Sequence, residues 1–291
     1  MKRILFIINP ISGVGRQKLI EKYAESILDK SRCSFDFVYT QYSRHAETIA
    51  KDSCNIYEII VAVGGDGTIN EIASGLIGSQ CTMAIIPTGS GNGLARCLGI
   101  PLKLKKALAL INTGIVRKID TISCNDKCFV NVGGIGFDAE IGHLFDTAEK
   151  RGLLTYIKIT LAEILYFKQK QYELSFDGKT RSIEALLVSV ANSTQWGNDI
   201  KIAPKARVDD GLVDICVLKK FPLYLSPIIA FRLIRGTITG SKYFETFSVS
   251  SIEITQDDVP LKYHLDGEPM INESKTLKIK VLPLSISVIV P

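Results

Sequence analysis

Hydrophobic and polar positions follow two alternating patterns over the first 120 or so residues. Short apolar runs predict strands, and Ile59–Val63 is apolar on both faces, as in a buried parallel strand. Between these runs, apolar residues recur at helical spacing, as in the stripe from Leu19 to Leu28. Regular alternation of strand and helix is typical of a parallel sheet covered by helices. The predicted strands are Arg3–Ile8, Phe35–Tyr39, Ile59–Val63 and Met83–Ile86, and the predicted helices include His45–Lys51, one from about Thr68, one near Leu94 and Lys105–Ile111.

The pattern changes after about Thr121, where short strands predominate. Asp177-Gly178 between two of them predicts a tight hairpin. This half is therefore expected to be a largely antiparallel β-domain, interrupted by helices near Leu153–Phe167 and Leu223–Ile234. We place the domains at residues 1–121 and 122–283, and leave open whether a last strand at about 284–291 returns to the first domain. The predicted strands are Cys128–Val132, Tyr172–Phe176, Ile183–Val190, Val213–Leu218, Phe247–Thr255, Leu261–Leu265, Leu277–Leu282 and Ile286–Val290.

Composition narrows the class of protein. With 46% hydrophobic and 22% charged residues in 291, the chain is neither disordered nor a coiled coil. Its net charge of +5 favours anionic partners such as nucleotides or acidic lipid surfaces, but is too weak to indicate nucleic acid. The seven cysteines form no C-x-x-C pair, which favours a reducing cytoplasm. The uncharged stretch Ile72–Ala95 is rich in glycine, so we expect a soluble protein whose membrane contact is peripheral.

The strongest chemical signal is a glycine-rich loop, Gly64-Gly65-Asp66-Gly67-Thr68, between a buried strand and a helix. Glycines there let backbone N–H groups converge on an oxyanion, and the helix N-terminus adds partial positive charge. Asp66 would face the phosphates, where a carboxylate is tolerated when a cation such as Mg²⁺ lies between them. No Gly-Lys-Ser/Thr follows, so this is not a P-loop.

Two further loops occupy equivalent places, Asn9–Arg16 after the first strand and Pro87–Gly93 after the fourth. The carboxyl ends of parallel strands lie at one edge of a sheet, where ligands bind. Each loop alone is also compatible with an ordinary turn. Three on one edge are hard to explain as turns alone, and together they indicate phosphate handling.

The second half contributes His264-Leu265-Asp266-Gly267-Glu268-Pro269 at the end of a predicted strand. A transferase acting on a hydroxyl needs a carboxylate to accept its proton, and Asp266 or Glu268 could do so. Asp-Gly is equally ordinary turn chemistry. Asp209-Asp210-Gly211-Leu212 has the same two interpretations, a turn or a cation site that uses Asp210.

These motifs, in this order, resemble the diacylglycerol kinase catalytic family, which includes bacterial lipid kinases and the sphingosine and ceramide kinases. The resemblance rests on Asn9-Pro-x-Ser12-Gly13, Gly64–Thr68 with Asn70-Glu71, Pro87–Asn92 and Asp266-Gly-Glu268. It implies an α/β class fold, with an N-terminal parallel α/β domain like that of phosphofructokinases and a C-terminal antiparallel β-sandwich. It also implies ATP and Mg²⁺ as cofactors, a membrane lipid as substrate, a peripheral membrane location and, as one possible assembly, a homodimer.

The resemblance also implies roles for individual residues. Asp66 would help to hold the catalytic Mg²⁺, and Asp266 and Glu268 lie where the family has its proton acceptor. Arg207 and Leu212, through their carbonyls, and Asp210 match a second Mg²⁺ site of bacterial members. The residues that would bind ATP are Asn9, Pro10, Ile11, Ser12, Gly13, Thr40, Gly64, Gly65, Gly67, Thr68, Asn70, Glu71, Ser90 and Asn92.

One position departs from the family. Its diacylglycerol kinases usually carry an acid after the Asn of the third loop, where this chain has Gly93. The run Gly89–Ala95 is more similar to the sphingosine and ceramide kinases, so the lipid is left open between diacylglycerol and a sphingoid or ceramide-like acceptor. An enzyme like NAD kinase, whose family shares the GGDGT loop, and a non-catalytic nucleotide- or lipid-binding protein are the alternatives.

Overall fold

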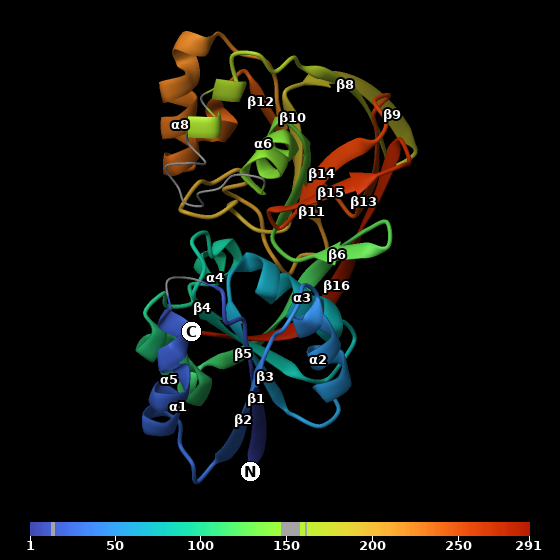
Figure 1. The fold of residues 1–291 in the computed structure, drawn as a ribbon. Helices are drawn as coiled ribbons and strands as arrows, with labels where there is room; N and C mark the ends of the chain where they lie inside the picture. The colour runs from blue at the N-terminus through green and yellow to red at the C-terminus, as the bar shows by residue number, and fades with distance from the viewer. Residues whose placement is uncertain (13–14, 147–157, 161) are drawn as a thin grey trace. The chain divides into compact units, whose positions relative to one another are not determined.

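The computed structural model describes residues 1–12, 15–146, 158–160 and 162–291 (Figure 1). The chain forms two compact units, Met1–Thr121 with Pro283–Pro291, and Ile122–Leu282. Of the helix expected at Leu153–Phe167, residues 153–157 and 161 lie outside the described residues. None of the described helices is both long and apolar enough to cross a membrane.

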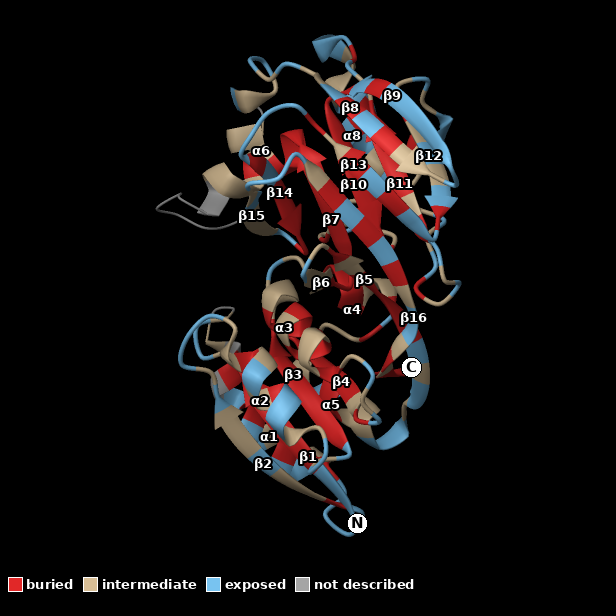
Figure 2. Cartoon of the chain, turned by 90° about the vertical axis from the view of Figure 1, so that its right-hand side faces the viewer, coloured by how far each residue is buried: buried red, intermediate tan, exposed pale blue. Residues whose placement is uncertain are grey.

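The first unit is built on a parallel sheet. Its strands are β1 (Lys2–Ile8), β2 (Cys33–Tyr39), β3 (Ile59–Gly64) and β4 (Thr82–Pro87), in the order β2-β1-β3-β4. The end of β16 (Thr276–Val290) extends this sheet, with Ser287 opposite Thr82. In β1, β3 and β4 nearly every residue is buried, as Figure 2 shows, because helices cover both faces.

Helices cover both faces of this sheet (Figure 1). The helices α1 (Ile20–Ile27) and α5 (Leu104–Thr113) lie on one face, and α2 (His45–Ser53) and α3 (Asp66–Leu76) on the other. Ala24 and Leu108 pack against Phe6 in the core of the first face. Short helices, η1 (Arg16–Leu19) and α4 (Gly93–Cys97), follow two of the loops at the edge of the sheet.

The second unit is a β-sandwich. One layer is antiparallel, in the order β12-β11-β10-β7-β14-β15. Its strands are β7 (Val132–Gly136), β10 (Leu187–Ala191), β11 (Val213–Leu218), β12 (Phe244–Val249), β14 (Leu261–Leu265) and β15 (Glu268–Asn272). The other layer contains β8 (Lys170–Phe176), β9 (Lys179–Ala185), β13 (Ser251–Thr255) and the first part of β16. The fold class expected from sequence is confirmed.

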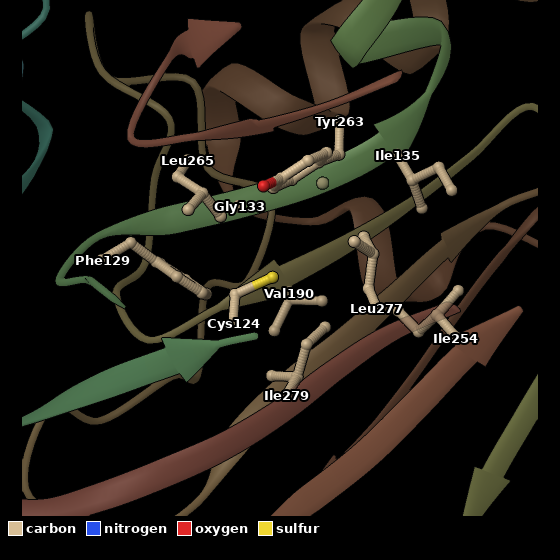
Figure 3. A pocket seen from close by; sticks show the side chains of 11 residues that line it. Cys124, Phe129, Gly133, Ile135, Val190, Ile254, Tyr263, Leu265, Leu277 and Ile279 are labelled. Atoms are coloured by element: carbon tan, nitrogen blue, oxygen red, sulfur yellow. The ribbon is translucent and has the colours of Figure 1, made fainter. Parts of the chain in front are cut away.

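The interior of the sandwich is apolar and closely packed. Figure 3 shows side chains from the two layers, among them Val190, Ile254 and Leu277, pointing toward one another around a void of about 10 Å³. A void of that size holds about one water molecule. A lipid chain does not fit into it.

A second apolar cluster lies on the other side of the six-stranded layer. There α6 (Phe137–Asp146), η2 (Leu223–Leu225), α8 (Ser226–Arg235) and η3 (Ile238–Gly240) cover the sheet. The cluster joins Ile229 of α8 to Cys216 and Leu218 of β11. One face of α8 is thereby fixed in the core.

Five of the predicted strands were wrong in detail. Phe247–Thr255 is two strands, β12 and β13, which belong to different layers. Ile183–Val190 is two strands, because the chain passes from one layer to the other at Leu186, between β9 and β10. Cys128–Val132 is interrupted between β6 (Lys127–Phe129) and β7. Leu277–Leu282 and Ile286–Val290 form one strand, β16, which has residues in both units. The Asp177-Gly178 hairpin is confirmed, with Phe176 opposite Lys179.

Candidate functional site

Three loops of the first unit follow neighbouring parallel strands. The first loop (Asn9–Ser12 of the described residues) follows β1, the second loop (Gly64–Thr68) ends β3, and the third loop (Pro87–Gly93) ends β4. Their strands lie side by side in the order β1-β3-β4, so the loops share one edge of the sheet. Gly13, predicted to bind ATP, lies outside the described residues.

Asn9 links the first loop to the second. Its side-chain amide donates to Thr68 Oγ1 over 3.1 Å, and its backbone N–H donates to the carbonyl of Val63 over 3.0 Å. Its Oδ1 accepts the N–H of Ile11, which turns the chain away from the strand. Only a side chain that both donates and accepts makes this set of contacts.

Ser12 links the first loop to the third. Its hydroxyl lies 2.8 Å from Thr88 Oγ1, and it donates to the carbonyl of Asn9 over 2.9 Å. Thr88 is buried, with 3% of its surface exposed. The backbone of the first loop is therefore held at a fixed distance from the third.

The second and third loops touch through their backbones. A Cβ on Gly89 would lie 2.6 Å from the Cα of Gly65, which no side chain tolerates. The N–H of Thr88 donates to the carbonyl of Gly64 over 2.9 Å, and the N–H of Gly93 donates to Asp66 Oδ1 over 2.8 Å. The glycines are thus needed for close approach of two loops, and Gly93 stands where its amide orients the Asp66 carboxylate.

Asn92 shapes the third loop. Its backbone has φ of 50°, in the left-handed region that Asn tolerates, and its side-chain amide donates to the carbonyl of Gly89 over 2.8 Å. Its Oδ1 is buried without a hydrogen-bond partner. A buried oxygen without a partner costs free energy unless a ligand or water meets it. This oxygen therefore marks a place for a donor or a cation beside the Gly93 that binds Asp66.

The other predicted nucleotide-binding residues differ in their burial and in their hydrogen-bond partners. Glu71 faces α2, where its carboxylate accepts the N–H groups of Arg44 and Ala46 over 3.0 and 3.1 Å. It therefore stabilises the N-terminus of that helix, a structural role that sequence spacing did not reveal. Thr40 follows β2, and its backbone N–H donates to the carbonyl of Ile8. Asn70 is buried in α3, and Ser90 is exposed in the third loop.

Asp266 is a buried anchor in the second unit. With Gly267 it forms the turn between β14 and β15, and both residues have positive φ, as a two-residue hairpin of this type requires. Its carboxylate accepts three backbone N–H groups, from Val130 over 3.0 Å, Asn131 over 2.8 Å and Val132 over 3.0 Å. These bonds take the amides that would have continued the expected strand, which explains the break between β6 and β7.

The three amides that bind Asp266 belong to a larger buried polar network. Asn131 accepts the N–H groups of Asn192 and Ser193, and the Ser193 hydroxyl donates to Asn131 Oδ1. The Asn192 amide donates to Val130 over 2.9 Å. Sequence reasoning missed this network, because its members are more than 60 residues apart along the chain.

A second buried polar cluster, also missed, lies beside it. Asp138 Oδ2 accepts the Ser189 hydroxyl over 2.8 Å and lies 3.2 Å from His264 Nε2. A Cβ on Gly134 would lie 2.3 Å from that same oxygen, so only glycine leaves room for the carboxylate. His264 stands two residues before Asp266, so the cluster fixes the strand that carries the turn.

The segment Arg207–Leu212, the predicted second Mg²⁺ site, is a turn in which Asp210 Oδ1 accepts the N–H of Leu212 over 3.1 Å. Arg207 lies 3.7 Å from the Asp209 carboxylate. Burial raises the pKa of the nearby Asp214, an effect that a bond from Ser248 opposes and the Asp210 carboxylate increases. Across the described residues, no three His, Cys, Asp or Glu side chains gather as a metal cluster.

Three of the seven cysteines are buried thiols with strongly raised pKa values. None of the seven cysteines forms a disulfide, and burial raises the pKa of Cys81, Cys124 and Cys216 to about 12. Thiols with such pKa values stay protonated near neutral pH and react slowly. A thiolate at these three positions is therefore not expected to act as a nucleophile. The candidate functional groups that remain are the carboxylates and backbone amides of the loops and of the Asp266 turn.

The bonds of Asp266 predict a structural cost for its replacement. In Asp266→Asn, Oδ1 can keep the amides of Asn131 and Val132, but the new NH₂ group would face the N–H of Val130. Two donors facing each other in a buried place are expected to lower the free energy of unfolding by about 1–3 kcal/mol. Thermal unfolding followed by circular dichroism measures the loss.

Asp177→Asn is the matched control for that variant. Asp177 begins the other Asp-Gly hairpin and has a φ of 49°, close to the 51° of Asp266, but its side chain is exposed. We expect it to melt like the wild type. Equal melting of the two variants would show that the bond from the Val130 amide contributes nothing measurable.

Comparison with known proteins covers both units. Residues 3–124 match the diacylglycerol kinase catalytic domain, and residues 131–290 match the YegS C-terminal NAD kinase beta sandwich-like domain. The chain is 30% identical to the diacylglycerol kinase of Bacillus subtilis (strain 168) over 282 residues, which is 92% of this chain and 90% of that protein. It is also 30% identical over 246 residues to a Shewanella frigidimarina (strain NCIMB 400) protein named "Probable lipid kinase YegS-like", covering 81% of this chain and 77% of that protein.

Solved structures share the fold. A diacylglycerol kinase from Bacillus anthracis str. Sterne has a TM-score of 0.75 and 24% identity, covering all of this chain and 97% of its own. Yeast NADH kinase complexed with NADH has a TM-score of 0.52 and 11% identity, covering all of this chain and 84% of its own. Since the diacylglycerol kinase catalytic domain model covers all three loops and the likeness to the Bacillus subtilis enzyme extends over 92% of the chain, the chain belongs to the diacylglycerol kinase family of phosphotransferases.

Proposed function

We propose that this protein is an ATP-dependent lipid kinase that transfers the γ-phosphoryl group to the hydroxyl of diacylglycerol or of a sphingoid or ceramide-like lipid. The observation that carries the proposal is the joining of three glycine-rich loops at one edge of the parallel sheet, through Asn9–Thr68, Ser12–Thr88 and Gly65–Gly89. Turns that bind no common ligand do not require hydrogen bonds or close contacts to one another. Loops that present amides to one polyanion do need them.

Nucleotide binding rests on the amides of these loops and on the N-terminus of α3. That helix runs for 11 residues from Asp66, and a helix N-terminus attracts phosphate through its N–H groups and its dipole. No P-loop lysine is available, so the charge of the triphosphate is balanced by the loop amides and a divalent cation.

The residues present fit a Mg²⁺ ion bound with ATP. Mg²⁺ takes oxygen ligands and commonly uses one or two carboxylates together with phosphates and water. Asp66 supplies a carboxylate whose orientation is fixed by Gly93, and Asn92 supplies a buried oxygen without a partner. When bound, the ion would neutralise charge on the phosphates during transfer.

For the proton acceptor we favour Glu268 over Asp266. Asp266 is 9% exposed and binds three backbone amides, so its carboxylate serves the fold of the turn. Glu268 follows directly on the turn, opposite Leu265, and is partly exposed. A carboxylate that accepts a proton from substrate has to be reachable by that substrate. In the proposal, Asp266 holds the turn and Glu268 takes the hydroxyl proton.

The alternative activity like that of NAD kinase is less well supported. The likeness to yeast NADH kinase is one of fold, at 11% identity, whereas relatives named as diacylglycerol kinase or lipid kinase are 30% identical over most of the chain. The Asn9-Pro10 start and the Asp266–Glu268 turn also follow the lipid kinase pattern. Phosphoryl transfer to a lipid therefore explains more of the chain.

The test is to incubate the purified protein with Mg²⁺, γ-labelled ATP and either a total lipid extract or NAD. We expect label in a lipid product, which mass spectrometry then identifies as phosphorylated diacylglycerol, sphingoid base or ceramide. Omission of Mg²⁺ should abolish the product. Label in NADP, or nucleotide binding without transfer to any lipid, would contradict the proposal.

A further inference from the structure

The turn η2 and the helix α8 are apolar nearly all the way round. On the inner side, Ile229 is buried, with 5% of its surface exposed, and Leu225 and Leu233 pack against the same cluster. The backbone carbonyl of Leu233 also accepts the N–H of Lys201 over 2.9 Å. Within the part of the chain that the structure describes, the helix is therefore held on the sandwich by one side.

Its other side exposes large hydrophobic side chains. The exposed fractions are 79% for Tyr224, 50% for Ile228, 58% for Phe231 and 55% for Ile234. Ile228, Phe231 and Ile234 recur every three residues, so they form one continuous stripe on the helix. We call Leu223, Tyr224, Ile228, Phe231 and Ile234 the α8 face; Figure 1 shows α8 at the outside of its unit.

The charged residues of the segment that carries this face are all basic, and one of them, Lys219, is paired with Glu245 over 3.4 Å. From Cys216 to Phe244 the sequence contains no Asp or Glu, but five basic residues, Lys219, Lys220, Arg232, Arg235 and Lys242. The Arg235 guanidinium lies 5.6 Å from the centre of the Phe231 ring, and Lys242 lies 5.1 Å from the Tyr243 ring. Aromatic and aliphatic side chains bordered by Lys and Arg are typical of helices that lie in the surface of an anionic membrane.

We propose that the α8 face docks onto a phospholipid membrane that carries anionic headgroups. The apolar stripe would enter the boundary between headgroups and acyl chains, while Lys220 and Arg235 remain at the level of the phosphates. A second copy of the chain is a poorer occupant, because a symmetric contact through this face would bring the two basic borders together. The inference deepens the proposed function, because a lipid acceptor resides in a bilayer, but its test requires no ATP.

Vesicle flotation tests the docking. The probes are vesicles of phosphatidylcholine alone and vesicles with about 30% phosphatidylglycerol, an anionic lipid. We expect the wild type to float with the anionic vesicles, to bind the neutral ones more weakly, and to be released by salt. Phe231→Ser with Ile234→Ser should lower the partition coefficient roughly tenfold or more, because two apolar side chains no longer leave water.

Two further variants separate apolar from charged contributions. Lys220→Gln with Arg235→Gln should weaken binding to the anionic vesicles and leave binding to the neutral ones unchanged. Ile115→Ser with Val116→Ser is the matched control, because these residues of β5 (Ile115–Cys124) are equally exposed, at 63% and 58%, in the other unit. That control should bind vesicles like the wild type.

Three results would overturn the docking proposal. They are failure of the wild type to bind either vesicle, equal binding by the Phe231/Ile234 variant, and conversion of a wild-type dimer to a monomer by those two substitutions. The last would assign the face to a second copy, as size-exclusion chromatography can show. Turnover on a short-chain lipid dissolved in water should persist in the α8 variants, so loss of docking and failure of the kinase proposal are distinguishable.

Discussion

Glu268→Gln is expected to lower kcat about 10²–10⁴-fold, the usual contribution of a positioned proton acceptor. The amide cannot take the proton of the lipid hydroxyl, while its size and its place in β15 are unchanged. Because Glu268 is partly exposed, thermal unfolding should stay like that of the wild type. Initial rates at saturating ATP and lipid measure the effect, and the KM for ATP should change little.

Glu273→Gln is the matched control for this prediction. Glu273 lies five residues further on and is exposed, so its replacement should leave turnover unchanged. Normal turnover in a folded Glu268→Gln variant would remove this residue from the mechanism. A lower kcat in Asp266→Asn with unchanged melting would transfer the role of acceptor to Asp266.

Asp66→Asn is expected to lower kcat about 10²–10⁴-fold as well, through a different cause. The substitution removes the negative charge that would hold Mg²⁺ near the phosphates. Asn keeps an Oδ1 that can accept the N–H of Gly93, so the contact between the second and third loops survives. Turnover measured against Mg²⁺ concentration should reach half its maximum only at a higher concentration of the metal, with melting unchanged.

The control for this second variant is Asp52→Asn, at an exposed acid of α2 in the same unit. It should keep full activity and the same Mg²⁺ dependence. If folded Asp66→Asn turned over lipid like the wild type, the metal-binding role of the second loop would be wrong, although ATP binding by the loop amides could still stand.

Local sequence patterns were sufficient for the fold class. Buried parallel strands such as Ile59–Gly64 are apolar throughout because both faces are covered, and the amphipathic helices between them carry one apolar stripe. The Asp177-Gly178 turn is equally local, since the two residues that adopt positive φ are those that tolerate it. The order of the loops along the chain likewise required no coordinates.

Contacts between distant residues decided what these motifs do. Glu71 stands beside the second loop in sequence, yet its carboxylate serves the N-terminus of α2. From its local sequence, Asp266 is an acidic residue in a turn. The three backbone amides that bind its carboxylate lie about 135 residues earlier in the chain. The switch of layers at Leu186 has no local signal either, because the residues directly before and after it, Ala185 and Leu187, are both apolar.

The sequence by itself determined the class of the fold, the three loops and most elements of the first unit, because backbone propensity, apolar periodicity and glycine tolerance act over a few residues. The tertiary structure alone decided which polar groups are used up in holding the chain together, among them Glu71, Asp138 and Asp266. It also decided which apolar side chains of α8 were left uncovered. A buried polar group can bond to any complementary group that the fold places beside it. The spacing of residues along the chain does not specify which group that will be.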